Sequence, residues 1–405
     1  MTSHVDLTGQ DYYRNPAASL QRLRDHGPVV EVRFPIVGRI WATTTQALAD
    51  RVLKDTETFT IRKADGQVAG MRWWMPPMLR TFANSMLSMD EPYHTRLRDI
   101  VDEAFRRRAV LDMEPQIQPT ADQLAGDMFA EGAPADLVQR YARVLPLSVI
   151  CELLGLPAAD RPTFMAWAGG LSRLTGALDF LRMLPKLYAI KRYIEAHLDT
   201  VRRHGGEGLI AEIVRVENEG GRISPEEIVS MVFLLLFAGY ETTTHLISGA
   251  VHELLKNPEL RDWLEEDFSR VDLAVEEFLR FLSPVQFTKP RFVRRDVDLG
   301  GVTVKKGERI MAMLAAANMD PSANPHPERL DLARRPNRHV AFGTGIHFCL
   351  GHQLARIEGR CALKALLQRW PSLSLAVPPS EITWRERVGL NAIDRLPVVQ
   401  AGKLT

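Results

Sequence analysis

Apolar residues recur at three- and four-residue spacing along most of this chain, and that spacing is typical of amphipathic helices. The pattern predicts helices at residues 17–26, 91–108, 115–130, 137–155, 185–204, 207–218, 225–255, 259–267 and 271–282. A serine, a proline and two glutamates at positions 224–227 favour a helix start there, and Asn257-Pro258 ends that long helix. A further amphipathic pattern follows residue 351.

Strand-like alternation is scarcer. The segments that show it are residues 29–34, 40–43, 297–304, 309–314 and 396–399, with turns favoured at 300–301 and 306–307. The chain is therefore expected to be mainly α with small β-sheets. No repeat, low-complexity tract or glycine- and serine-rich linker divides the sequence. We expect a single domain over residues 1–405.

Charge and hydropathy narrow the possible partners. The 405 residues include 51 basic and 50 acidic side chains, a near balance that gives no sign of a nucleic-acid partner. The first 28 residues have no apolar stretch typical of a signal peptide. The longest apolar run, residues 231–239, is far shorter than the roughly 20 residues that span a bilayer. We therefore expect a cytoplasmic protein with no membrane span.

The three cysteines lie far apart, so neither a disulfide framework nor a zinc site is indicated. Cys151 and Cys361 are expected to be small buried apolar residues. Cys349 differs, because it lies where a loop becomes a helix. Helix amides lower the pKa of a thiol there and favour the thiolate that binds iron. Gly345 and Gly351 flank it and let the backbone pass close to a flat ligand.

The segment FGTGIHFCLG at residues 342–351 resembles the haem-binding loop of bacterial (class I type) cytochromes P450, F-x-x-G-x-H-x-C-x-G. The resemblance implies a triangular α-rich prism with a smaller β-rich region. It also implies noncovalent haem b with the Cys349 thiolate as the iron ligand, which favours O–O cleavage. Further cofactor contacts are implied at Phe342, Gly343, His347 and Gly351. Met319 replaces an arginine common in the family.

The segment AGYETT at residues 238–243 interrupts an apolar helix with polar side chains. Glu241 and Thr242 can face solvent on an amphipathic helix, or the threonine can bond back to the helix backbone. The segment is also similar to the family element beside the distal haem face. That resemblance implies haem contacts at Ala238 and Gly239, with Gly239 leaving room for dioxygen. It implies catalytic roles for Thr242 and Glu241 in oxygen activation and proton relay.

Glu277 and Arg280 lie three residues apart on a predicted helix, where they can pair. They resemble the family's buried structural ExxR pair, for which Arg335 or Arg338 is the candidate third member.

Haem carries two propionates, which need donors from separated segments. The resemblance implies such contacts at five places: His94, Arg98, Arg291, His339 and His347.

The family's substrate regions correspond to residues 61–88, 160–190, the helix before Gly239, the turn after Pro284 and the loop near Val388. They suggest a hydrophobic pocket, although ordinary packing of a long loop explains its apolar residues equally well. The candidate pocket residues are Trp73, Trp74, Met75, Met78, Phe82, Phe287, Thr288 and Val388. We expect a medium to large apolar substrate, such as a terpenoid, steroid, fatty acyl or polyketide skeleton. Nearby cations that can bind a carboxylate are Arg62, Lys63, Arg72 and Arg80.

No flavin or iron–sulfur segment is evident in the sequence, so electrons are expected from a separate ferredoxin and reductase. Candidate arginines for an acidic ferredoxin are Arg106, Arg107, Arg108, Arg356 and Arg360. Two alternatives to a dioxygen-dependent monooxygenase are a peroxide-driven peroxygenase and a noncatalytic haem-binding sensor.

Overall fold

The computed structural model describes residues 6–7, 9–34, 38–63, 66, 68, 85–107, 112–171, 177–220, 223–385 and 389–400. Its α-helices are α1 (Gln10–Arg14), α2 (Pro16–Asp25), α3 (Gln46–Lys54), α5 (Tyr93–Arg107), α6 (Glu114–Asp127), α7 (Val144–Leu154), α8 (Arg161–Leu171), α9 (Ala177–His204), α10 (Leu209–Asn218), α11 (Pro225–Lys256), α12 (Pro258–Glu266), α13 (Val271–Leu282), α14 (Leu314–Asn318) and α15 (His352–Arg369).

The strands form one larger sheet and two small ones. They are β1 (Val29–Phe34), β2 (Gly38–Thr43), β3 (Phe59–Thr60), β4 (Ala135–Asp136), β5 (Arg291–Val293), β6 (Val297–Leu299), β7 (Val302–Val304), β8 (Arg309–Ala312), β9 (Leu373–Leu375) and β10 (Pro397–Gln400). The larger sheet has the order β1-β2-β8-β5-β3, in which only β2 and β8 are parallel. The others are β4-β10-β9 and the hairpin β6-β7.

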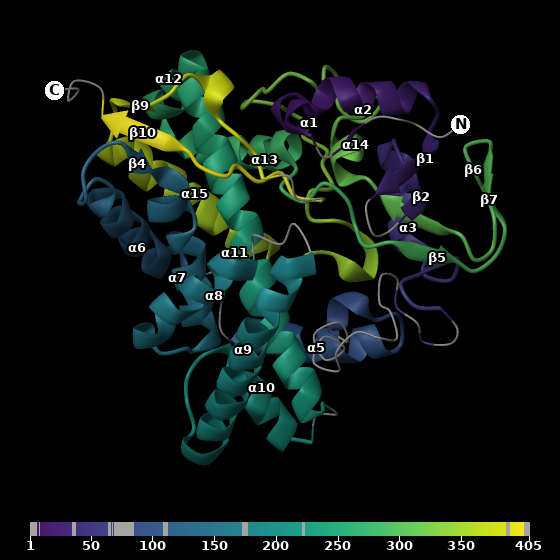
Figure 1. Cartoon of the computed structure of the whole chain (residues 1–405), viewed down its shortest axis with the longest axis horizontal. Coiled ribbons are helices and arrows are strands. Elements are labelled where there is room, and N and C mark those ends of the chain that lie inside the picture. Colours follow the sequence, from purple (N-terminus) through teal and green to yellow (C-terminus); the bar gives the residue numbers. More distant parts are fainter. Residues whose placement is uncertain are drawn as a thin grey trace.

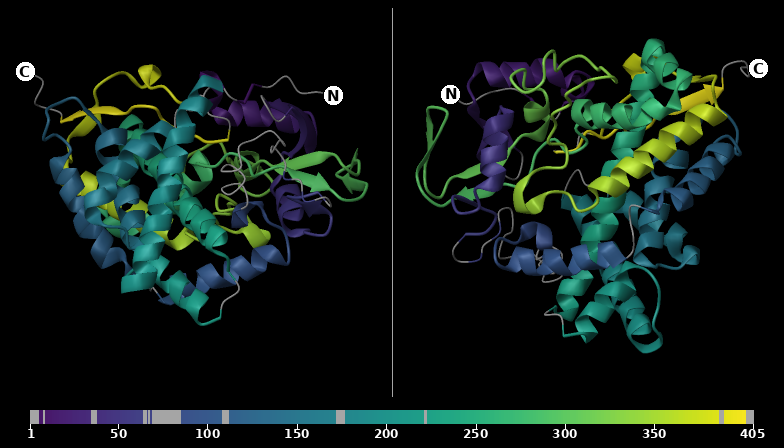
Figure 2. Two further views of the ribbon diagram at one scale, coloured as in Figure 1. Left: turned by 60° about the horizontal axis from the view of Figure 1, so that its bottom comes forward. Right: turned by 180° about the vertical axis from the view of Figure 1, so that it is seen from behind.

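The larger sheet lies with α1, α2 and α3 on one side of the molecule, and most of the longer helices make up the other side (Figure 1). Seen from behind, α15 runs beside α6 (Figure 2), and the two helices pack together. α15 also packs against α11 and α13. Because the residues after Cys349 form α15, this helix fixes the cysteine loop to the helical core.

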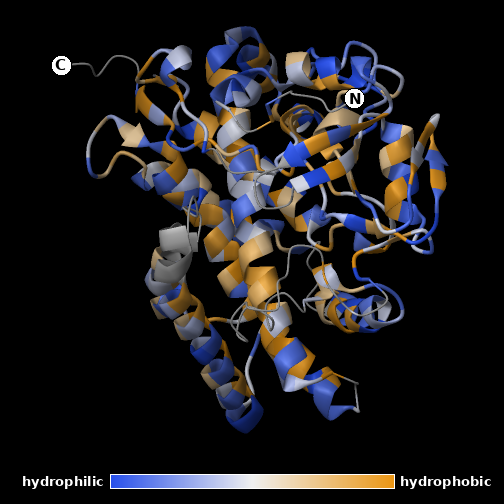
Figure 3. Ribbon diagram, turned by 45° about the vertical axis from the view of Figure 1, so that its right-hand side comes forward, coloured by the Kyte–Doolittle hydropathy of each residue, from blue (hydrophilic) through white to orange (hydrophobic). Residues whose placement is uncertain are grey.

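The longest helix, α11, runs through the middle of the helical part (Figure 1). A capping box fixes its start: Ser224 Oγ accepts from the Glu227 N–H, and the Glu227 carboxylate accepts from the Ser224 N–H. Its middle is strongly apolar (Figure 3). By length and composition α11 is the one candidate membrane span among the described residues, but 61% of its apolar window is buried, as in a core helix.

One connected hydrophobic cluster extends from Leu7 near one end of the chain to Val398 near the other. Smaller clusters fill the space around the larger sheet. Tyr141 shows how distant segments join, since its buried hydroxyl donates to the Ala362 carbonyl of α15 at 2.8 Å.

The predicted helices correspond to helices in the structure, with three differences. Residues 137–155 divide into a short π-helical turn (Val138–Ala142) and α7. The helix expected from residue 185 starts at Ala177 and contains Pro185. Helices α1, α3, α8 and α14 were not predicted, because their apolar patterns are short or interrupted. Among the strands, the predicted 297–304 segment is the β6-β7 hairpin, whose Gly300 and Gly301 both have positive φ as the turn requires.

Candidate active site

Backbone hydrogen bonds hold the loop before α15 in one conformation. The Cys349 N–H donates to the Phe342 carbonyl at 2.9 Å, and the Gly343 N–H donates to the Val340 carbonyl at 2.8 Å. Gly345 has a φ of +70°, and a Cβ there would lie 2.4 Å from the carbonyl oxygen of Leu53 in α3. Only glycine fits this position, so the close approach of α3 helps to fix the loop.

The Cys349 thiol is not activated in the way the sequence suggested. Burial raises its pKa, against the opposing effects of the Gly351 N–H and the guanidinium groups of Arg98 and Arg356. The helix-terminal N–H of Gly351 lowers the pKa as expected, but burial outweighs it and the net shift is upward. A metal ion that coordinates the sulfur would deprotonate the thiol outright. The Gly351 N–H and the Arg98 and Arg356 guanidinium groups would then stabilise the thiolate. A Cβ at Gly351 would meet no described atom within 4 Å, so there is open space beside this glycine.

Although α11 is a core helix, one stripe of it is accessible to solvent. Ala238 is exposed and Thr242, one turn later, is half-buried, whereas residues 243–254 on the same helix are buried. No described element of the chain therefore covers this stripe of the helix. The Thr242 hydroxyl donates to the Ala238 carbonyl at 3.0 Å, which confirms the back-bonding interpretation of this threonine.

Gly239 has a packing role that the resemblance did not imply. A Cβ at this position would lie 2.9 Å from Cδ1 of Ile150 in α7. The missing side chain therefore lets α11 approach α7.

Glu241 has a cationic neighbour that the sequence did not reveal. The buried Arg143 guanidinium is hydrogen-bonded to Tyr240 and attracted by Glu241, although burial outweighs both and lowers the pKa of Arg143. Arg143 belongs to the turn between the π-helical residues and α7, about 100 residues earlier in the chain. No local pattern links it to α11, so only the fold brings these charges together.

Four of the predicted cations converge near the cysteine loop. The His94 and His347 rings lie edge to face with centroids 4.3 Å apart. Burial, followed by the charges of His94 and Arg291 and then by Lys289 and Arg98, lowers the pKa of His347 to about 3. His94 Nδ1 and His347 Nε2 are buried and have no hydrogen-bond partner among the described residues. Unpaired buried donors beside two guanidinium groups fit the carboxylates of haem.

His339 lies elsewhere. Its Nε2 is 2.9 Å from a carboxylate oxygen of Glu276, and its Nδ1 accepts from the Ala341 N–H. Burial alone would raise the pKa of Glu276, but hydrogen bonds from His339 and Arg356 outweigh it and lower the pKa to about 2. His339 is thus held by a neighbouring acid in α13, and its predicted propionate contact has no support from this geometry.

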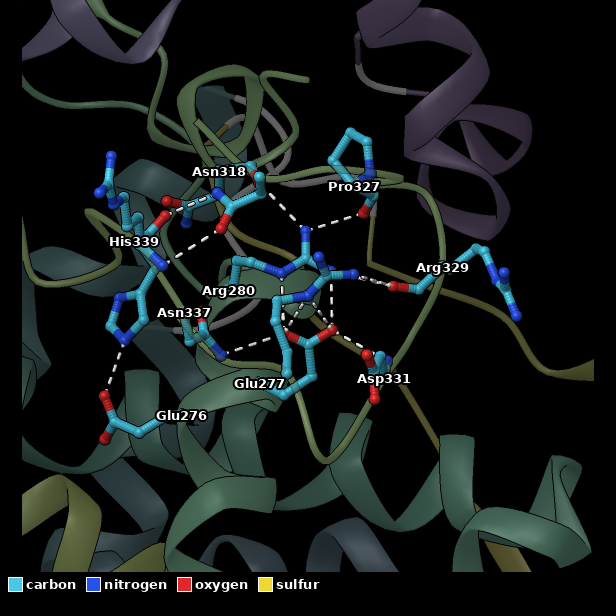
Figure 4. Close-up of polar contacts among 12 residues, drawn as sticks. Glu276, Glu277, Arg280, Asn318, Pro327, Arg329, Asp331, Asn337 and His339 are labelled. Atoms are coloured by element: carbon cyan, nitrogen blue, oxygen red, sulfur yellow. Dashed lines mark hydrogen bonds and ion pairs between the residues drawn. The ribbon is translucent and has the colours of Figure 1, made fainter. Parts of the chain in front are cut away.

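Glu277 and Arg280 of α13 form a fully buried pair, as predicted (Figure 4). The Arg280 Nε and Nη2 atoms each donate to one Glu277 oxygen at 2.8 Å. The third member is Arg334, whose Nε lies 3.1 Å from both Glu277 oxygens. Arg335 and Arg338, the two candidates from the sequence, are exposed, so that assignment is wrong. Further donors to Glu277 are the Asp331 N–H and the Asn337 side chain.

Comparison with known proteins decides what this arrangement is. The sequence model of the cytochrome P450 family matches residues 188–384. The chain is 40% identical to vitamin D(3) 25-hydroxylase of Pseudonocardia autotrophica, over 98% of this chain and 96% of that protein. It is 36% identical to the cytochrome P450 monooxygenase PikC of Streptomyces venezuelae, over 96% and 92% of the two chains.

The chain belongs to the cytochrome P450 family.

Solved structures agree with this assignment. The myxobacterial cytochrome P450 CYP267B1 in complex with myristic acid has a TM-score of 0.90 and 36% identity, covering 98% of this chain and 99% of that one. PksS of the Bacillus subtilis bacillaene polyketide synthase has a TM-score of 0.88 and 34% identity, covering 98% and 99%. The predicted fold and enzyme class are therefore confirmed: this is a bacterial-type cytochrome P450 monooxygenase, an enzyme that inserts oxygen into small molecules.

The family uses a haem-thiolate cofactor, and the residues of this P450 fit it. The unpaired nitrogens of His94 and His347, the space beside Gly351 and the accessible stripe of α11 are what a haem held at Cys349 would use. Among the described residues, no group of three or more histidine, cysteine or acidic side chains could hold a metal ion without a porphyrin.

The P450 also contains a buried acid that sequence reasoning missed. Glu358 of α15 is 1% exposed, and neither carboxylate oxygen has a well-aligned hydrogen-bond partner among the described residues. Burial raises its pKa to about 8, against the opposing effect of the nearby Thr243 hydroxyl of α11. Glu358 is therefore mostly protonated at neutral pH, in contrast to an ordinary glutamate. The sequence feature that could have revealed this buried acid is the glutamate within the apolar pattern of α15, in the segment Arg-Ile-Glu-Gly.

Most of the arginines expected to bind a ferredoxin form ion pairs with acidic residues of this P450. Arg356 binds Glu276, and Arg360 binds Glu114 and Asp272. Arg106 binds Glu103. The side chains of Arg107 and Arg108 lie outside the described residues. The predicted basic docking surface thus has less free charge than its sequence suggested.

Most of the predicted substrate contacts fall outside the described residues, namely Trp73, Trp74, Met75, Met78, Phe82 and Val388, together with Arg72 and Arg80. Phe287 is half-buried, and its ring lies beside Gly389 of the C-terminal segment. The Thr288 hydroxyl accepts from the Ala312 N–H at 3.2 Å, so it fixes the backbone of its own segment. Arg62 donates to the Ser88 carbonyl, and the Lys63 ammonium lies 5.2 Å from the Phe292 ring centroid.

Proposed function

We propose that Cys349 ligates the iron of haem b and that this P450 inserts one atom of dioxygen into an apolar small molecule, by hydroxylation or epoxidation. The observation that carries the proposal is the pair of unpartnered nitrogens on His94 and His347 beside the Cys349 loop. When bound, a thiolate-ligated haem supplies the activation of dioxygen, because the thiolate pushes electron density that favours O–O cleavage.

Residues of α11 and α15 supply protons and orientation. Thr242 lies on the accessible stripe, where its hydroxyl can exchange its bond to the Ala238 carbonyl for a bond to the reacting oxygen. Glu241 lies close enough to the buried Arg143 guanidinium to attract its charge. Glu358 of α15 holds a proton next to Thr243, which lies on the buried side of α11. We assign Glu241 to the proton relay and Glu358 to a store of one proton on the far side of the helix.

The proposed substrate class rests on the accessible stripe of α11 and on the substrates for which the relatives are named. Relatives named for vitamin D(3), mycinamicin IV and 6-deoxyerythronolide B act on large, mainly apolar skeletons, and a structural neighbour contains myristic acid. A steroid-like, polyketide, terpenoid or fatty acyl substrate fits this range. We also propose that the chain works as a single cytoplasmic domain and receives electrons from a separate ferredoxin and reductase.

The test is turnover of a panel of these skeletons with two sources of oxidising power. One arm supplies dioxygen, NADPH, a ferredoxin and its reductase; the other supplies hydrogen peroxide alone. Product only in the first arm supports the monooxygenase. Efficient product with peroxide alone would favour the peroxygenase alternative, and a haem protein inactive in both arms on every skeleton would favour the sensor.

A further inference from the structure

Helix α1 is attached by side-chain hydrogen bonds to the C-terminal segment of the chain. Gln10 forms two bonds with the backbone of one residue: its Nε2 donates to the Trp384 carbonyl at 2.6 Å, and the Trp384 N–H donates to Gln10 Oε1 at 2.9 Å. At the other end of α1, the Arg14 side chain donates to the Ser380 carbonyl at 3.0 Å. The short helix is therefore fixed to the segment that leads to Val388.

A second contact of α1 is fully buried. Tyr12 is 2% exposed, and its hydroxyl donates to Oε1 of Gln286, which is also 2% exposed. The Gln286 Nε2 donates to the carbonyls of Ser283 at 2.7 Å and of Leu282 at 3.3 Å, and the Gln286 N–H donates to the Gly389 carbonyl at 2.9 Å. The bond from Tyr12 thus fixes a residue that joins the end of α13 to the C-terminal segment. Without that hydroxyl, a buried acceptor would lose its donor.

The segments that α1 contacts also bind each other. An antiparallel bridge joins Val285, in the turn after α13, to Leu390 of the C-terminal segment. Within the C-terminal segment, a second antiparallel bridge joins Trp384, the partner of Gln10, to Ile393. Helix α1, the turn after α13 and the C-terminal segment therefore form one connected network of hydrogen bonds.

Phe287 lies where these segments meet. A Cβ at Gly389, whose φ is +93°, would lie 3.2 Å from Cε2 of Phe287, so the glycine lets the ring approach the backbone closely. Phe287 is half-buried, whereas the adjacent Gln286 is buried. A shift of Gln286 would therefore move the Phe287 ring and the Gly389 backbone together, because Gln286 is covalently joined to one and hydrogen-bonded to the other.

We infer that Tyr12 is a positioning residue for the substrate pocket. Through Gln286 it fixes Phe287 and the adjoining C-terminal segment, which are two of the segments assigned to the substrate. The inference rests on the proposed function, which makes Phe287 part of that pocket. A role confined to stability is the competing explanation. Positioning is favoured because the Gln286 side chain and N–H bind the turn after α13 and the C-terminal segment, which both flank Phe287.

The first test measures hydrogen exchange in peptides that cover residues 283–291 and 389–394. Tyr12→Phe removes only the hydroxyl. Tyr141→Phe is the matched control, since Tyr141 is also buried and its hydroxyl donates to the Ala362 carbonyl of α15. We expect exchange in both peptides to be roughly fivefold faster in Tyr12→Phe and unchanged in Tyr141→Phe. Equal exchange in the wild type and Tyr12→Phe would contradict the inference.

The second test uses imidazole and 1-phenylimidazole, which bind ferric haem iron through the same kind of nitrogen and differ in bulk. Spectral titration gives the dissociation constant of each. We expect that of 1-phenylimidazole to rise roughly fivefold in Tyr12→Phe, the equivalent of one lost hydrogen bond, and that of imidazole to stay unchanged. Tyr141→Phe should resemble the wild type with both ligands. Equal changes for the two ligands, or no change, would reduce Tyr12 to a structural role.

Gln286→Met tests the route between Tyr12 and the pocket. In that background, Tyr12→Phe should have no further effect on either measurement, because the acceptor of its hydroxyl is already missing. Additive effects of the two substitutions would contradict a route through Gln286. A wild-type protein that binds no haem would contradict the proposed function, and the inference with it. Normal haem binding with no effect of Tyr12→Phe would contradict the inference alone.

Discussion

Arg334 binds the Glu277 carboxylate together with Arg280, with its Nε 3.1 Å from both carboxylate oxygens. The two arginines also donate to a common acceptor, the Arg329 carbonyl. Glu277 therefore joins α13 to the segment that leads into the cysteine loop. This network places Arg334, and not its neighbours, in the structural triad.

Replacing Arg334 by alanine should lower the free energy of unfolding by about 3–5 kcal/mol, because it removes one partner of a buried ion pair. Arg335→Ala is the matched control, since its side chain is exposed one residue away. That control should change the free energy by less than about 0.5 kcal/mol. Urea denaturation of both variants checks the assignment, and equal effects would contradict it.

Gly345→Ala tests how tightly α3 holds the cysteine loop. The new methyl group would lie 2.4 Å from the Leu53 carbonyl oxygen, at a φ of +70°. Gly301→Ala shares the positive φ but would meet no described atom within 4 Å. We expect the Gly301 variant to lose about 1 kcal/mol from backbone strain alone, and the Gly345 variant to lose at least twice as much and to bind haem poorly. Thermal denaturation with haem titration measures both; similar losses would argue against the close contact.

Thr242→Ala should uncouple electron use from product formation, because the hydroxyl on the accessible stripe is lost while haem remains bound. Thr244→Ala is the control: Thr244 makes the same kind of bond, to the Tyr240 carbonyl at 2.8 Å, but is buried on another face of α11. We expect roughly a tenfold or larger loss of product per NADPH in the first variant, with more hydrogen peroxide released, and little change in the second. Equal coupling in wild type and Thr242→Ala would remove Thr242 from the mechanism.

Glu358 gives the protein a specific pH dependence. Its pKa in the folded state is raised to about 8, from 4.5 for an ordinary glutamate. Because the folded state binds this proton more tightly, the stabilising contribution is fully present below about pH 4.5 and is lost as the pH rises through about 8. Relative to Glu358→Gln, the wild type should lose up to about 1.4 kcal/mol of unfolding free energy per pH unit in this window.

Denaturation curves recorded across that window measure the effect. Glu381→Gln, at an exposed site in the segment before the last strand, should follow the wild type at every pH. Parallel curves for the wild type and Glu358→Gln would show that Glu358 is ionised in the folded protein.

The sequence predicted the parts of the site that depend on local pattern. The Cys349 loop and the Glu277–Arg280 pair each follow from residues close together in the chain, whereas the propionate candidates His94, Arg98, Arg291 and His347 came from the family resemblance. What it missed depends on tertiary packing. Arg143 reaches Glu241 from the turn before α7, and Glu358 acquires its raised pKa only through burial in the folded protein.

The errors have the same origin. Three arginines occur at positions 334, 335 and 338, and only the path of the folded loop selects the first. In the sequence, His339 resembles a residue that binds a propionate. In the fold, its imidazole binds the carboxylate of Glu276 in α13 instead. The packing of Gly239 against Ile150 likewise depends on tertiary structure, and no helical pattern could indicate it.

The ferrous carbon monoxide spectrum of the wild type and of Cys349→His tests the central claim most directly. Cys361→Ser is a suitable control, since Cys361 is a buried residue of α15. We predict the red-shifted Soret band of a thiolate-ligated haem in the wild type and in Cys361→Ser, and its loss in Cys349→His. Retention of that band in Cys349→His would contradict the assignment of Cys349 as the iron ligand.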